Sequence, residues 1–418
     1  MNLDNYLLNF IQTTDDPSLD GMYYIMEKLG NPHKKLKYVH VAGTNGKGSI
    51  CEMLSRILVL SDYKVGKFMT PHLITAKESI SINNQHISNS EALIYIDMLN
   101  GIREEFKKDI GKEPTRFEIL TSIAILHFAY SNCDIVILEV GMGGRFDCTN
   151  IIEPIVSAFG SISYDHMAVL GNTLKKIAFE KAGIIKENSN SVIFEQESLP
   201  VFEKQCTLKN NILHTISNTD ISNYNFDINY QYFSYNNIPY IINLKGRKQI
   251  ENTCVVLETI NILKESKFNI SDSNVLNGLK TVVHNARFET INQKPLLIFD
   301  GAHNENAIQN FIETVNDYYS NNTKTFIISI INTKDYKPML DLILSAFPKS
   351  IFIFTNGVAS HNYISKEELF EYASSQILNK NHNIYTEDFE NIDKNLNSEV
   401  NFIIGSFYTY ESAKKKFN

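Results

Sequence analysis

The chain has 418 residues, which suggests two or three domains at roughly 150 residues each. A formal net charge of −8 gives no basic surface for non-specific binding of nucleic acid, so we expect no such partner. No apolar run reaches the roughly 18 residues needed to cross a bilayer, and the first ten residues lack the basic cluster of a secretory signal. The five cysteines form no CxxC pair, which argues against a disulfide framework or a structural zinc site. We therefore expect a cytoplasmic protein with no membrane partner.

Strands and helices alternate through the first part of the chain. Residues 37–42 form a short apolar run that ends at a glycine, which predicts a buried strand, and residues 50–60 have helical periodicity. Apolar runs at 134–140 and 155–162 predict two more strands, and residues 173–185 predict a helix. This alternation is typical of a doubly wound, mostly parallel sheet in an α/β domain.

The pattern changes between about 220 and 245, where polar and apolar residues alternate with period two. That alternation predicts a small antiparallel β excursion within the first domain. From Pro295 the strand–helix alternation resumes, which predicts a smaller C-terminal, Rossmann-like α/β domain of about 120 residues. We predict a first domain over residues 1–286, a second over 295–418, and a linker at about 287–294.

The strongest motif is GTNGKGS, between a predicted strand and a predicted helix. Its glycines let backbone N–H groups turn toward a phosphate, and the helix N-terminus adds a favourable potential for anions. Lys47 can reach the β- and γ-phosphates of ATP and the Ser49 hydroxyl can bind Mg²⁺, although Gly48 separates the two residues that are adjacent in most P-loops. A Gly-rich turn without a ligand is the alternative, and the lysine and the flanking pattern disfavour it. The predicted ATP loop comprises Gly43, Thr44, Asn45, Gly46, Lys47, Gly48 and Ser49.

Two further residues, Glu139 and His166, are candidates on chemical grounds. Glu139 ends a predicted central strand, at the edge where ligands bind in open α/β sheets. Its carboxylate and the imidazole of His166, 166 − 139 = 27 residues later, can hold magnesium near the phosphates. Considered alone, Glu139 also suits a loop cap, His166 suits a structural role, and Lys181 suits a solvated helix position.

Several sequence blocks resemble, in order and spacing, those of the folylpolyglutamate synthase and dihydrofolate synthase family of the Mur ligase superfamily. Together they extend over nearly the whole chain. The blocks are GTNGKGS, TPHL (70–73), LEVGMGGRFDCTN (138–150), SISYDH (161–166), EKAGII (180–185), DGAHN (300–304) and GSFY (405–408).

The resemblance implies roles for the candidate residues of the first domain. Ser49 and Glu139 are expected to bind one magnesium ion, and His166 is expected to help bind a second. Lys181 is expected to be carbamylated by CO₂, which turns a cation that two magnesium ions would repel into a carboxylate-like ligand. Asn252, within the block LKGRKQIENT, is a candidate adenine contact.

The domain joint and the second domain are expected to supply further ATP contacts. Arg287, within HNARFET, is a candidate phosphate-binding cation, because a planar guanidinium suits phosphate better than an ammonium does. The family usually has WxGRxE in this segment, and here His284 replaces the Trp and Ala286 replaces the Gly. By the same resemblance, Asp300 and His303 contact ATP.

The resemblance implies an ATP-dependent acid–amino-acid ligase that adds L-glutamate to tetrahydrofolate or its polyglutamates, as a monomer. ATP is expected to phosphorylate the folate carboxylate, and the amine of glutamate then attacks the acyl phosphate. Lys47, Arg287, His166 and Lys181 are the predicted catalytic residues. Two anions must meet in the first step, and Lys47, Arg287 and magnesium are expected to supply the positive charge that makes this possible.

Two alternatives stay open. The same site can join glutamate to dihydropteroate, so dihydrofolate synthase is an alternative main activity or a second one. From a different class, a P-loop regulatory ATPase accounts for the loop but leaves Glu139, His166, Lys181 and DGAHN without a role.

Overall fold

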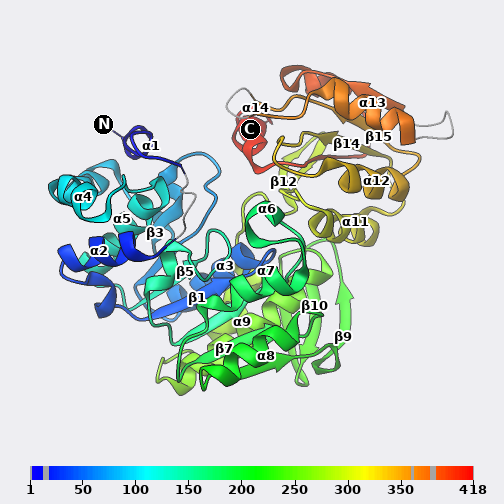
Figure 1. Ribbon diagram of the computed structural model, residues 1–418. Coiled ribbons are helices and arrows are strands. Elements are labelled where there is room, and N and C mark those ends of the chain that lie inside the picture. Colours follow the sequence, from blue (N-terminus) through cyan, green and yellow to red (C-terminus); the bar gives the residue numbers. More distant parts are fainter. Residues whose placement is uncertain (1, 13–17, 359–361, 377–382, 418) are drawn as a thin grey trace. The chain divides into compact units, whose positions relative to one another are not determined.

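The computed structural model describes residues 2–12, 18–358, 362–376 and 383–417, and its chain forms two compact α/β units (Figure 1). The first unit comprises Met1–Asn225, Tyr232–Asn243 and Ile250–Val282. The second comprises Phe226–Gln231, Leu244–Gln249 and Val283–Asn418. Within the described ranges, no helix is both long enough and apolar enough to span a bilayer.

A large sheet is the centre of the first unit, with strand order β4-β3-β2-β5-β1-β6-β7-β8 among the described residues. β3 and β4 pair antiparallel at one edge, and the other strand pairs are parallel. This arrangement confirms the predicted mostly parallel sheet. The strands are β1 (Tyr38–Ala42), β2 (Val65–Phe68), β3 (Ile80–Ile82), β4 (Gln85–His86), β5 (Ile135–Glu139), β6 (Val156–Phe159), β7 (Asn190–Phe194) and β8 (Ile212–Ile216).

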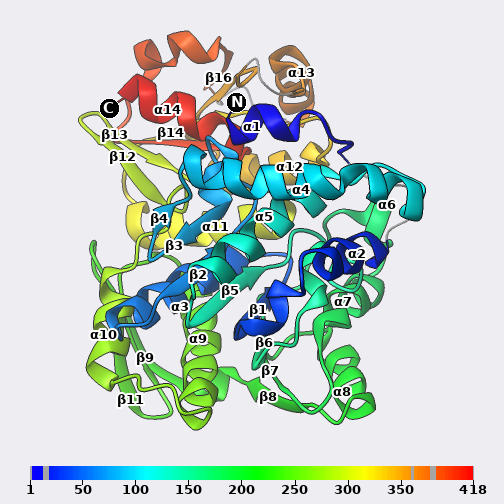
Figure 2. The ribbon, with the colours of Figure 1, turned by 90° about the vertical axis from the view of Figure 1, so that its left-hand side faces the viewer.

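Helices cover both faces of this sheet, as a doubly wound fold requires (Figure 2). Val136 and Leu138 of β5 point into a core shared with α1, α2, α4 and α5, whereas α3 contacts β1, β2 and β5. The helices are α1 (Leu3–Leu7), α2 (Asp20–Lys28), α3 (Lys47–Leu60), α4 (Asn89–Ile110), α5 (Arg116–Tyr130), α6 (Met167–Leu170), α7 (Leu174–Lys181), α8 (Leu199–Leu208), α9 (Arg247–Glu265) and α10 (Asp272–Thr281).

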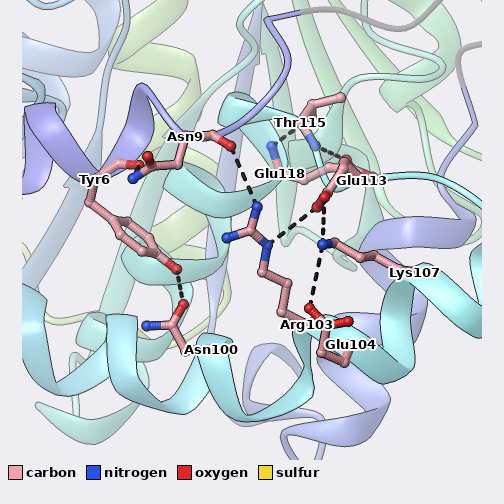
Figure 3. Close-up of polar contacts among 9 residues, drawn as sticks. All are labelled: Tyr6, Asn9, Asn100, Arg103, Glu104, Lys107, Glu113, Thr115 and Glu118. Atoms are coloured by element: carbon pink, nitrogen blue, oxygen red, sulfur yellow. Dashed lines mark hydrogen bonds and ion pairs between the residues drawn. The ribbon is translucent and has the colours of Figure 1, made fainter.

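Polar contacts join the N-terminal helices on the α4–α5 side (Figure 3). The Tyr6 hydroxyl of α1 donates to Asn100 Oδ1 of α4 at 2.8 Å. Arg103 of α4 pairs with Glu113 at 3.2 Å, in the connection that leads to α5. α5 then begins at a capping box whose Thr115 side chain accepts from the third backbone N–H of the helix. These contacts fix α1 and the α4–α5 connection against one another.

A small sheet of order β11-β10-β9 follows the large one in the chain. Its strands are β9 (Ile221–Phe226), β10 (Gln231–Tyr235) and β11 (Ile238–Ile242). The predicted antiparallel excursion is therefore confirmed. β10 is almost entirely buried, whereas β9 and β11 are largely exposed, so exposure differs between the strands more than between the two faces of each strand.

The second unit contains a sheet of order β12-β13-β17-β14-β15-β16 within the described residues. β12 pairs antiparallel with β13, and the remaining pairs are parallel. β12 lies in the stretch that was expected to be a linker, and the domain boundary stays a prediction. The elements are β12 (Glu289–Gln293), β13 (Leu296–Phe299), β14 (Lys324–Ile328), β15 (Ile351–Phe354), β16 (Asn383–Thr386), β17 (Val400–Ile404), α11 (Glu305–Tyr319), α12 (Tyr336–Ala346), α13 (Lys366–Gln376) and α14 (Tyr410–Phe417).

Candidate active site

The GTNGKGS loop connects β1 to α3 in a conformation that needs glycine. Gly46 has φ +86° and is the N-cap of α3, which begins at Lys47 rather than at about residue 50 as predicted. A Cβ on Gly46 would lie 2.4 Å from Asn252 Oδ1, so the side chain of Asn252 is packed against the loop. Lys47 and Ser49 therefore lie in the first helical turn, where the N–H groups of a helix N-terminus favour anions.

The strands on either side of β1 bring their carboxyl ends to this loop. In β5, Glu139 is in register with Val41, two residues before Gly43. The Glu139 side chain is buried, and its Oε2 accepts the N–H of Thr70, in the TPHL segment, at 3.0 Å. The structure thus brings a predicted magnesium ligand to the edge at which the ATP loop begins.

The segment after β6 provides a docking surface for the loop. The N–H groups of Thr44 and Asn45 both donate to the carbonyl of Ser161, at 2.8 and 3.2 Å. The Thr44 hydroxyl donates to the Ser163 carbonyl at 3.0 Å. A Cβ on Gly160 would lie 2.3 Å from the carbonyl oxygen of Asn45, so only glycine permits this approach. Gly160, Ser161 and Ser163 were missed as site residues, although the glycine at the end of a strand was a usable signal.

His166 follows the docking segment and precedes α6. It has φ +50°, in the left-handed region, and its side chain is 49% exposed. Its backbone N–H donates to Asp165 Oδ1 at 2.8 Å. His166 lies after β6, and its left-handed backbone leaves the imidazole accessible, as is required of a residue that binds a ligand.

Lys181 and Lys47 share one acceptor. Lys181 Nζ donates to the Gly43 carbonyl at 2.9 Å, and Lys47 Nζ donates to the same oxygen at 3.1 Å. Burial lowers the pKa of Lys181 to about 7; the charge of Lys47 acts in the same direction, while Asp165 and Asp147 oppose it. The expectation of a solvated Lys181, from the residue alone, is wrong because the side chain is only 4% exposed.

The long block LEVGMGGRFDCTN holds the end of α7 that carries Lys181. A Cβ on Gly144 would lie 2.8 Å from the Lys181 carbonyl oxygen, and one on Gly183 would lie 2.5 Å from Arg145 Cα. The Arg145 N–H donates to the carbonyl of Glu180 at 2.8 Å. The glycines of this block and of EKAGII therefore permit a close approach of two backbones, which fixes the position of Lys181.

The first-unit candidates fit an ATP-bound magnesium ion. Mg²⁺ prefers oxygen ligands and commonly uses one or two protein groups together with phosphate and water. Ser49 and Glu139 offer a hydroxyl and a carboxylate, both buried near the loop. Among the described residues, no group of three or more His, Cys, Asp or Glu side chains forms a metal site of its own.

The candidates of the second unit form a separate cluster. Arg287 Cζ lies 4.2 Å from the centroid of the Phe407 ring. The carboxylate of Asp300 accepts the N–H groups of Phe288 and Ala302, each at 2.8 Å; burial raises its pKa and the Arg287 charge opposes this rise. His303 Nδ1 is hydrogen-bonded to the carbonyl of Gly301 at 2.8 Å, so the Nδ1–H tautomer is present. Asp300 therefore organises the loops on both sides of it.

The Gly-rich loop after β1, the doubly wound sheet and the buried lysine are typical of one class, the Mur-ligase-type α/β proteins. The family model described as Mur ligase middle domain matches residues 41–260, more than half of the chain. A Bacillus subtilis (strain 168) protein named dihydrofolate synthase/folylpolyglutamate synthase is 32% identical over 420 residues, covering 96% of this chain and 95% of that protein. The chain belongs to the dihydrofolate synthase/folylpolyglutamate synthase family.

Solved structures give the same result. The folylpolyglutamate synthase of Thermotoga maritima has a TM-score of 0.83 at 27% identity, covering 99% of this chain and 95% of that one. The E. coli protein FolC, solved with DHPP and ADP, has a TM-score of 0.85 at 25% identity, and the match covers 99% of this chain and 97% of that one. The predicted fold class is confirmed, and the chain is a ligase of this family.

Proposed function

We propose that this protein is an ATP-dependent ligase that joins L-glutamate to the glutamyl γ-carboxylate of tetrahydrofolate or its polyglutamates, and that dihydropteroate is a second acceptor. The observation that carries the proposal is the packing of Lys181 and Lys47 on the Gly43 carbonyl, beside the end of the strand that carries Glu139. Family membership supports it, since relatives carry the names of both activities. We further propose a monomer that acts in the cytoplasm.

The proposed roles of the site residues follow from their charges. Lys47 and the N–H groups of the first turn of α3 would bind the β- and γ-phosphates of ATP. Ser49, Glu139 and His166 would hold Mg²⁺, which when bound neutralises the phosphates and the transferring phosphoryl group. Arg287 would bind phosphate oxygens. These positive groups allow the folate carboxylate to approach ATP, because they offset the repulsion between the two anions.

Asn252, Asp300 and His303 would complete the nucleotide contacts. Asn252 lies against Gly46, which supports a contact with the nucleotide beside the loop. Asp300 has both carboxylate oxygens committed to backbone N–H groups, which supports a role in shaping its loop. His303 has Nδ1 committed to a carbonyl, so Nε2 is the atom that would face ATP.

We also propose that Lys181 is carbamylated in the active enzyme. An ammonium beside Lys47 and a magnesium ion would be repelled, whereas a carbamate is an anionic oxygen ligand. The buried side chain and its hydrogen bond to Gly43 would hold the modified group in a fixed place. Intact-mass measurement of the native protein would detect the mass of one added CO₂, and an unmodified Lys181 in fully active enzyme would refute the assignment.

The test of the ligase function is ADP release by the purified protein with magnesium-ATP and tetrahydrofolate, with and without L-glutamate. We expect glutamate-dependent release and a product heavier by one glutamyl unit. Dihydropteroate in place of tetrahydrofolate tests the second activity. ADP release that is indifferent to glutamate with both acceptors would instead favour the regulatory ATPase, which the family relationship does not favour.

A further inference from the structure

The ring of Phe407 lies between two candidate ATP contacts of the second unit. Arg287 Cζ lies over this ring, 4.2 Å from its centroid. The imidazole of His303 packs on it with ring centroids 5.1 Å apart and an interplanar angle of 59°. One aromatic side chain therefore touches both groups.

The Phe407 ring is held by close packing against Gly301 and by the turn that carries it. A Cβ on Gly301 would lie 1.9 Å from Phe407 Cε1, so the ring packs directly against the backbone of the DGAHN segment. Phe407 begins a short 3-10 helix, Phe407–Thr409, whose cap is Ser406. The Ser406 hydroxyl accepts the N–H of Tyr408 at 3.2 Å. The turn that carries the ring is thus fixed by its own hydrogen bonds.

The backbone around Arg287 is also held. Ala286 and Phe288 both have left-handed backbones, with φ +58° and +42°. The carboxylate of Glu289 accepts the Ala286 N–H at 2.7 Å, and that of Asp300 accepts the Phe288 N–H at 2.8 Å. With the backbone set on both sides, the Phe407 ring constrains the direction of the Arg287 side chain.

We propose that Phe407 is a positioning residue for the ligase reaction, with its ring holding the Arg287 guanidinium and the His303 imidazole in the orientation that meets ATP. A guanidinium stacked by its face keeps its N–H donors, which lie in its plane, directed outward to a ligand. The inference rests on the proposed function, in which Arg287 and His303 contact ATP. It adds a residue that contributes to the reaction by aiming these two groups.

The test compares F407L, which keeps an apolar side chain without the aromatic face, with F407Y, which keeps the face. Phe347 is the control, because it is a buried phenylalanine of the same unit whose ring stacks on Phe326 and contacts Lys324 rather than Arg287 or His303. Each variant is assayed for glutamate-dependent ADP release, with kcat and the KM for ATP measured separately. The same F407L change is made in an R287A background, and circular dichroism verifies folding.

A cation–π contact at a partly exposed site is worth on the order of fivefold in rate. We expect F407L to lower kcat/KM for ATP about fivefold, and F407Y and F347L to stay within about twofold of wild type. In R287A, F407L should have a smaller effect, because only the aim of His303 is then lost. Full activity of F407L, or an equal loss with and without Arg287, would overturn the proposal. F407M replaces F407L if the latter does not fold.

A failure of the proposed function is distinguishable from a failure of this inference. If wild type releases no ADP in response to glutamate, the ligase proposal fails. ATP affinity measured by calorimetry on the same variants then decides the role of Phe407. Weaker binding in F407L but not in F407Y would support it, and equal binding in both would overturn it.

Discussion

Acid should destabilise the first unit through His40, a fully buried histidine of β1. Its Nε2 lies 2.9 Å from Thr149 Oγ1, and the Thr149 hydroxyl donates to Asp147 Oδ1 at 2.6 Å. His40 Nε2 must then donate, and the ring is neutral with its lone pair on buried Nδ1. Burial lowers the pKa of His40 to about 3, with a smaller contribution from the charge of Lys186. The folded state therefore keeps this ring neutral at pH values where the unfolded chain protonates it.

The sign and the size of the effect follow from this difference. Below pH 6.5 His40 is protonated in the unfolded state but stays neutral in the folded state. The free energy of unfolding therefore falls as the pH falls. At pH 5, about 1.5 units below the unfolded pKa and at about 1.4 kcal/mol per unit, His40 should cost about 2 kcal/mol relative to neutral pH. Hydrogen exchange of β1 amides, corrected for intrinsic rates, should show this loss at pH 5.0 against pH 7.5 in wild type and not in H40Q. H86Q, which removes an exposed histidine, is the control. An equal acid response in wild type and H40Q would refute the reasoning.

Three shorter predictions concern the GTNGKGS loop, the carbamylation of Lys181 and the left-handed residue Ala286, the last with A373G as its control. G46A should weaken ATP binding by calorimetry at least tenfold, because its Cβ would meet Asn252 Oδ1 at 2.4 Å and its φ of +86° is strained for alanine. Removal of CO₂ and bicarbonate should lower glutamate-dependent ADP release reversibly if Lys181 is carbamylated; release that is unchanged would contradict this. A286G should raise the free energy of unfolding by about 0.5 kcal/mol, because it relieves a left-handed alanine at φ +58°. A373G, within α13, should lower it by about 1 kcal/mol in the same urea titration.

Much of the fold follows from local patterns in the sequence. The apolar run ending at Gly43 predicted β1 within one residue, and the run at 134–140 predicted β5 within one residue at each end. These strands were predictable because their residues are buried on both faces and are therefore mostly apolar, with His40 in β1 and Glu139 at the end of β5 as the exceptions. β12 was not predictable in this way, since its five residues, Glu289–Gln293, are mostly polar and only Ile291 is fully buried.

The parts of the site that depend on contacts between residues far apart in the chain could not be predicted from the sequence. Gly160 looks like an ordinary strand end until Asn45 is found against it, 115 residues earlier (160 − 45 = 115). Phe407 belongs to a recognisable block, but nothing in GSFY indicates that its ring meets Arg287. Likewise, Glu289 matched a family position, while its contact with Lys414 of the last helix, at 2.8 Å, appears only in the folded chain. A glycine in the sequence indicates that another part of the chain can approach closely there, but which residue approaches is determined by the fold.

The geometry at Gly43 also bears on why a lysine suits the carbamylated position. Burial, and repulsion from the Lys47 ammonium on the same carbonyl oxygen, lower the pKa of Lys181 to about 7. A carbamate keeps one N–H on its nitrogen, so the 2.9 Å hydrogen bond from Lys181 to Gly43 can persist while the positive charge is lost. Lys47 would then face an anion in place of a cation. An arginine or an aspartate at position 181 offers only one of these properties, which predicts that neither K181R nor K181D restores the activity of wild type.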